Sequence, residues 1–189
     1  MQAMSEQPSK RHPLALRVLH WGLAFLLAVQ LMLGFAAEHW TTRTTSDALL
    51  SVHFRLGVLI LGLMLVRLTL RLALPMSEEY MPRWRRYAKS AVHGLLYLLI
   101  LALPVSGHVI WVWMGADRTL CAGIQVPALF VPPDDETGRA VAWYVHVYGA
   151  WMLLGLVLLH VVVAWFQSLR EKHFISRKMG FGKRGRSDC

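Results

Sequence analysis

The sequence predicts an all-α integral membrane protein that folds as a four-transmembrane-helix bundle with both termini in the cytoplasm. Of the 189 residues, 56% are hydrophobic and only 16% are charged, whereas about 25% of the residues in a soluble domain carry a charge. Four apolar segments exceed the roughly 20 helical residues that cross a bilayer. They are Leu14–Ala37, Ala48–Leu74, Ser90–Met114 and Ala140–Leu169.

The first apolar segment is predicted to be a retained spanning helix. Its ending, Phe35 to Ala37, loosely resembles the cleavage site of a secretory signal peptide. The segment is longer than the roughly 7 to 15 apolar residues of a signal core, however, and it contains His20 and Gln30. We therefore expect it to stay in the mature protein.

The chain divides into a cytoplasmic tail at 1–13, a transmembrane domain at 14–169 and a basic cytoplasmic tail at 170–189. Pro75 should end the second helix because proline cannot continue it, and Pro104 should kink the third helix near mid-membrane.

The distribution of positive charge predicts the orientation. Sixteen of the 20 Lys and Arg residues lie in the two tails with the adjoining helix ends and in the stretch 67–89. By the positive-inside rule these regions are cytoplasmic, so the net charge of +9 marks topology and predicts no nucleic-acid partner. The arginines on the outer side are Arg43, Arg55, Arg118 and Arg139, and the tryptophans expected in an outer aromatic belt are Trp40, Trp111, Trp113 and Trp143.

Six of the nine histidines fall within the predicted spans. An ionisable side chain at that depth is costly unless it has a partner, so a cluster of such residues suggests a functional site. One isolated histidine would more simply form a hydrogen bond between helices, but six together favour ligands. They are His20, His53, His93, His108, His146 and His160.

The fourth span carries the most informative spacing. His146 and His160 are 14 residues apart, so they return to within about 40° of one helix face while lying about 21 Å apart along the axis. One helix thus offers a ligand near each membrane surface. At matching depths, His20 can pair with His160 and His53 with His146.

The third span leaves this pairing open. His93 lies at the cytoplasmic depth and His108 at the outer depth, and their spacing of 15 residues lets them share a face. The sequence alone therefore cannot exclude either of them as a ligand.

Two haems stacked across the bilayer, each between two imidazoles, would form an electron path. The sequence has no Cys-x-x-Cys-His motif, so the expected cofactors are two haem b groups held by ligation and packing. Cys121 and Cys189 are predicted to lie on opposite sides of the membrane, which gives no disulfide framework.

Arg67 follows His53 by 14 residues and lies on the same face at cytoplasmic depth. Its guanidinium can donate a charge-assisted hydrogen bond to a haem propionate or a quinone carbonyl, or extend to lipid phosphates. Both readings remain open for Arg67, and lipid phosphates are favoured for Arg71.

An ordered set of short motifs resembles the bacterial cytochrome b561 family, whose relatives include the cytochrome b subunits of nickel-iron hydrogenases and formate dehydrogenases. The resemblance covers nearly the whole chain. The matching pieces are Leu19-His20-Trp21, His53 with Gly57 and Arg67, His93 with Tyr97, Ala102 to Gly107, Val126-Pro127, and His146 with His160.

The resemblance implies that His20 with His160 hold the cytoplasmic-side haem and that His53 with His146 hold the outer one. It also implies that His93 is no iron ligand and bonds a propionate or lines a quinone site. Two positions depart from the family: His108 stands at an apolar position, and Gln167 replaces a histidine of the last helix. The family location is the bacterial inner (cytoplasmic) membrane, with several passes.

A haem with two imidazole ligands has no open iron position, which leaves outer-sphere electron transfer. Family members of this size resemble superoxide oxidase, which implies an oxidoreductase that passes electrons from superoxide to ubiquinone. The outer loops carry four arginines and six acidic residues, so they offer no net positive field to gather an anion.

The alternative is a haem-bearing membrane anchor subunit of a hydrogenase- or formate dehydrogenase-like complex, which receives electrons from an attached redox protein. The expected partners are membrane lipid, a quinone and either a small electron donor or that attached protein. A haem-free transporter or metal carrier is a third reading, but metal ions gather histidines at one depth and these are divided between two.

Overall fold

The computed structural model describes residues 14–39, 42–74, 82–120, 123–131 and 136–170. Within these residues the structure is all helical, with no strand longer than an isolated bridge. The helices are α1 (Leu14–His39), α2 (Arg43–Ala73), α3 (Arg83–Trp113) and α4 (Glu136–Arg170). Each is long and apolar enough to cross a membrane, which confirms the predicted four-helix membrane fold.

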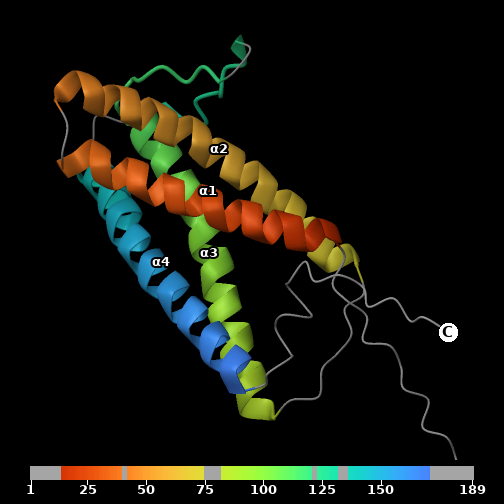
Figure 1. The fold of residues 1–189 in the computed structure, drawn as a ribbon. Coiled ribbons are helices and arrows are strands. Elements are labelled where there is room, and N and C mark those ends of the chain that lie inside the picture. Colours follow the sequence, from red (N-terminus) through yellow and green to blue (C-terminus); the bar gives the residue numbers. More distant parts are fainter. Residues whose placement is uncertain (1–13, 40–41, 75–81, 121–122, 132–135, 171–189) are drawn as a thin grey trace, which may run out of the picture.

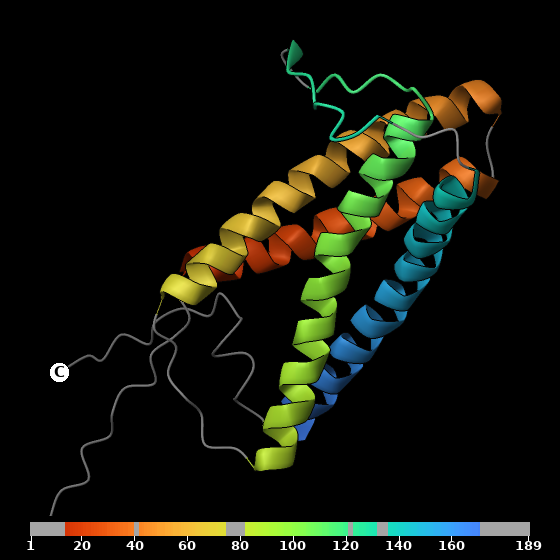
Figure 2. The ribbon, with the colours of Figure 1, turned by 180° about the vertical axis from the view of Figure 1, so that it is seen from behind.

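The four helices form two pairs. α1 packs along α2 and α3 packs along α4, and the pairs are joined through contacts between α2 and α3. Both views show the two pairs lying together where α1 ends and α4 begins, and diverging toward the opposite end (Figures 1 and 2). Following the predicted orientation, we call the converging end the outer end and the diverging end the inner end.

Three helices extend beyond the apolar segments that the sequence predicts. α2, α3 and α4 begin five, seven and four residues earlier, respectively. These additional turns are mostly polar, and backbone hydrogen bonds continue each helix into them although they are too polar to count as part of an apolar span. α3 also continues through Pro104, since a proline within a helix removes only one backbone donor.

Apolar side chains both fill the interior and cover the outside of the bundle. Two small clusters make the core: Leu23, Ile60 and Met64 between α1 and α2, and Leu99, Leu103 and Leu153 between α3 and α4. Outward-facing side chains such as Phe25 and Trp165 are about two-thirds exposed. Such a surface suits lipid and would be a large apolar patch in water.

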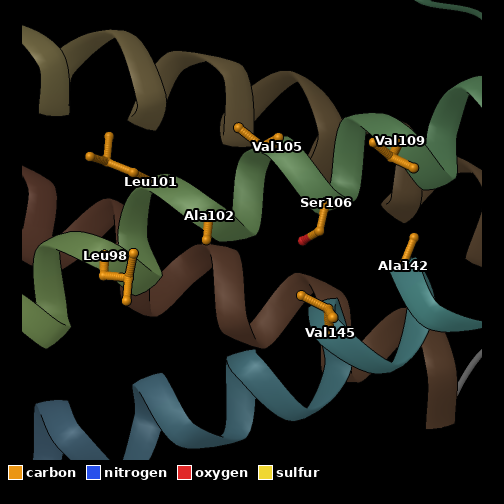
Figure 3. A pocket seen from close by; sticks show the side chains of 8 residues that line it. All are labelled: Leu98, Leu101, Ala102, Val105, Ser106, Val109, Ala142 and Val145. Atoms are coloured by element: carbon orange, nitrogen blue, oxygen red, sulfur yellow. The ribbon is translucent and has the colours of Figure 1, made fainter. Parts of the chain in front are cut away.

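An apolar groove of about 510 Å³ lies between α3 and α4 (Figure 3). Leu98 and Val105 on its wall are more than half exposed, so the groove opens on the side of the bundle that would face lipid. Ser106 supplies the hydroxyl group in its lining, and that hydroxyl donates to the carbonyl of Leu103.

The loop after α3 folds back over the outer end. The amide of Val126 donates to the carbonyl of Arg118, and the Arg55 side chain of α2 donates to the carbonyl of Thr119. Asp117 accepts hydrogen bonds from the hydroxyl and the amide of Thr119, which hold the pKa of that carboxyl below its usual value. The loop is therefore attached to α2 through Arg55, and it is attached to α3 through Trp111, whose indole N–H donates to the carbonyl of Asp117.

Trp111 differs from its expected place in the aromatic belt. Its side chain is 8% exposed, its ring stacks on Phe54 at 4.9 Å between centroids, and its indole N–H donates to the carbonyl of Asp117. The sequence placed it correctly near the outer interface but could not show that it turns inward. Trp40, expected in the same belt, lies outside the described residues.

Candidate functional site

Four histidines from three helices form two imidazole pairs. At the outer end, the ring centroids of His53 (α2) and His146 (α4) are 6.0 Å apart with planes at 77°. Toward the inner end, those of His20 (α1) and His160 (α4) are 6.4 Å apart at 75°. α4 thus contributes one member of each pair, and its 14-residue interval separates the pairs by about 21 Å along its axis.

The spacing within each pair fits a metal ion between the rings. An imidazole nitrogen lies about 2 Å from a transition metal that it ligates, so with the radius of each ring the centroids of two opposed ligands lie about 6 Å apart. The observed 6.0 and 6.4 Å match this geometry. Within the described residues, no group of three or more His, Cys, Asp or Glu side chains is placed to share a metal ion.

In the outer pair, both rings have their Nδ1 atoms next to backbone carbonyls. His53 Nδ1 is 3.1 Å from the oxygen of Gln30, and His146 Nδ1 is 2.9 Å from the oxygen of Leu103. A carbonyl oxygen only accepts hydrogen bonds, so each Nδ1 carries the proton and each Nε2 presents a lone pair. This is the tautomer that metal-ligating histidines commonly adopt.

Close contacts fix the positions of these two rings. The Gln30 side chain donates to the carbonyl of His53 at 2.9 Å, and Ser106 Oγ lies 3.1 Å from His146 Nδ1. A Cβ atom at Gly107 would lie only 2.9 Å from the His146 ring, and one at Gly34 would lie 3.1 Å from the His53 ring. The supporting roles of Gln30, Ser106 and Gly34 depend on packing between helices and were not predicted from the sequence.

The inner pair has different neighbours. An Arg67 Nη2 donor lies 3.2 Å from His20 Nδ1, and Arg67 Nη1 lies 3.5 Å from the hydroxyl of Tyr97. Arg71 donates to the same hydroxyl at 3.0 Å, so it turns inward instead of extending to lipid phosphates. The buried Nε of Arg67 has no hydrogen-bond partner among the described residues.

His93 lies beside the inner pair, with its ring centroid 5.3 Å from that of His160. Its Nδ1 donates to the carbonyl of Lys89 at 2.7 Å, which leaves Nε2 with a lone pair. The separation is shorter than the roughly 6 Å of two opposed ligands, so the distance favours His20 over His93 as the partner of His160.

The two residues that depart from the family pattern belong to neither imidazole pair. His108 stacks on Phe54 at the outer end, at 6.3 Å and 25°, and its buried Nε2 has no hydrogen-bond partner among the described residues. Gln167 lies exposed near the inner end of α4.

Four spanning helices with two imidazole pairs inside them define the class of a membrane cytochrome b that takes part in electron transport. The chain belongs to the prokaryotic cytochrome b561 family, whose model matches residues 11–182. Membership implies haem b as the cofactor and makes the chain a multi-pass bacterial membrane protein.

A relative from Escherichia coli (strain K12), cytochrome b561 homolog 1, is 26% identical over 160 residues. The matched region covers 82% of this chain and 88% of that relative. The likeness therefore extends over the whole bundle rather than over one helix pair.

Proposed function

We propose that this chain binds two haem b groups, one between His20 and His160 and one between His53 and His146, and passes electrons between the two faces of the bacterial inner membrane. The observation that carries the proposal is the pair of centroid separations, 6.0 and 6.4 Å, at two depths of one bundle. Bound in this way, haem iron supplies one-electron outer-sphere redox chemistry.

The protein contributes the positions of the ligands and the surroundings of the iron. The carbonyls of Gln30 and Leu103 orient the outer rings, and apolar helices exclude water from both pairs. Arg67 provides a donor at the inner pair, where a haem propionate or a quinone carbonyl can accept its hydrogen bond. His93 stands in the same region and is proposed to contact the propionate or the quinone.

The test of haem ligation is the haem content of the purified full chain, measured together with a reduced-minus-oxidised spectrum. We expect two haems per chain, and one in each single variant His20→Ala, His53→Ala, His146→Ala and His160→Ala. His39→Ala is the matched control, because His39 is exposed at the end of α1 and bonds only within its own helix. Unchanged haem content in all four ligand variants would reject the assignment.

We propose ubiquinone as the inner-side electron partner and superoxide as the outer donor, with an oxidoreductase activity. The family resemblance supports both partners. Three of the four outer arginines make contacts within the protein: Arg55 and Arg118 donate to loop carbonyls, and Arg139 forms a salt bridge with Glu136. Any attraction of superoxide must therefore be local. Enzymatically generated superoxide should reduce the purified protein, and superoxide dismutase should prevent the reduction.

If superoxide fails to reduce the haems while the four-ligand test succeeds, the anchor-subunit alternative becomes the better reading. Co-purification from native membranes would then be expected to recover an iron–sulfur partner.

A further inference from the structure

The two imidazole pairs differ in which ring nitrogen carries the proton. In the outer pair, carbonyl oxygens face both Nδ1 atoms, and each Nε2 is therefore available to iron. Both rings hold this arrangement through contacts within the protein, so the outer pair is already set for ligation.

In the inner pair, the ring of His20 does not carry its proton on Nδ1. A guanidinium can only donate hydrogen bonds and keeps its protons in proteins, so His20 Nδ1 accepts the bond from Arg67. In a neutral imidazole the proton then lies on Nε2, the nitrogen that would face iron. The Arg67–His20 bond and ligation of iron by neutral His20 exclude each other.

His160 also has a second neighbour. Its ring lies closer to His93 than to His20, at 5.3 against 6.4 Å between centroids, and the helix pairs diverge toward this end (Figure 2). Two protein groups, Arg67 and His93, thus compete for the two rings of the inner pair, whereas the outer pair has no such competitor among the described contacts.

We infer that the inner haem is held less tightly than the outer one and that Arg67 controls the binding of the inner haem. The reason is that Arg67 must release His20 before His20 can ligate iron. The inference rests on the proposed pair of haem sites. Release leaves Arg67 with its Nη2 and its unpartnered Nε free to donate to a carboxylate, a group that the haem itself brings.

The first experiment follows haem transfer from the purified full chain to excess apomyoglobin. We expect two phases of equal amplitude. His20→Ala should start with one haem and lose the fast phase, whereas the single haem of His53→Ala should leave at the fast rate. A single phase, or a fast phase that disappears in His53→Ala instead, would overturn the inference, whereas a protein with no haem at all would refute the proposed function.

The second experiment tests Arg67 directly. Haem transfer is stopped after the fast phase, when the protein still holds its outer haem, and this retained haem shows that the protein is folded. Haemin is then added back. Arg67→Leu should rebind haem several-fold faster than the unaltered chain. Arg71→Leu, which removes a neighbouring arginine that bonds Tyr97 but not His20, should rebind at the unaltered rate. Equal rates in all three proteins would show that Arg67 does not control binding.

Discussion

At the scale of single residues, backbone carbonyls and glycines decide how the outer imidazoles stand. His146 donates to the carbonyl of Leu103, in the turn that precedes Pro104, and Gly107 lies against the same ring. A short stretch of α3 therefore supplies both the acceptor and the space that position one ligand.

Replacement of Gly107 tests this arrangement. In Gly107→Ala the new methyl group would lie 2.9 Å from His146 Cε1, closer than packed atoms tolerate, so the ring must move. We expect haem content to fall from two to about one per chain, with the inner haem retained. Gly94→Ala is the control on the same helix, since a Cβ atom there meets nothing within 4 Å; a full complement of haem in Gly107→Ala would contradict the expectation.

The residue scale is also where prediction from the sequence was weakest. Spacing along a helix gives the depth and relative angle of each histidine. It predicted that His20 lies near His160 and His53 near His146, as the structure shows. It could not give the absolute rotation of α3, so His93 and His108 stayed as alternatives. Nor could it reveal the acceptor at Leu103, because every residue has a carbonyl and only packing shows which one faces a ring.

At the scale of helices, α4 is the element on which both pairs depend. Leu153, halfway between its two histidines, is 1% exposed and packs with Leu99 and Leu103 of α3. The spans themselves were predictable, because length and apolar composition are written in the sequence. The polar first turns of α2, α3 and α4 were missed. A count of apolar residues finds only the part of a helix that lies in the hydrocarbon core, whereas backbone hydrogen bonds extend the helix beyond it.

Truncation of this packing should loosen the bundle. Leu153→Ala removes a side chain with almost no exposed surface, and large-to-small changes at such positions cost about 2 to 5 kcal/mol. We expect a lower midpoint temperature for loss of the haem spectrum on heating in detergent. Leu158→Ala serves as the comparison, because Leu158 on the same helix is 57% exposed and should change the midpoint little.

At the scale of the whole molecule, the two helix pairs join at the outer end and separate toward the inner end, and this asymmetry parallels the difference between the imidazole pairs. The outer end combines a loop fixed to α2 and α3, stacked aromatic rings and two oriented imidazoles. At the inner end the helix pairs diverge, and Arg67 and Arg71 both contact the hydroxyl of Tyr97. Arg67 is also bonded to the His20 imidazole there. On the proposed function, the end with the attached loop and the two oriented imidazoles lies where an outer donor would deliver electrons, and the end where the helix pairs diverge lies where a quinone would exchange them.

This functional direction depends on the orientation in the membrane, which the two natural cysteines can report. Charge distribution predicts Cys121 on the outer side and Cys189 in the cytoplasm. In right-side-out vesicles, a membrane-impermeant maleimide should therefore label Cys189→Ser, which retains Cys121, but not Cys121→Ser, which retains Cys189. Inverted vesicles should give the opposite pattern, and labelling after solubilisation controls for reactivity. If Cys189 were labelled from outside, the bundle would stand the other way, and the pair at His53 and His146 would face the cytoplasm.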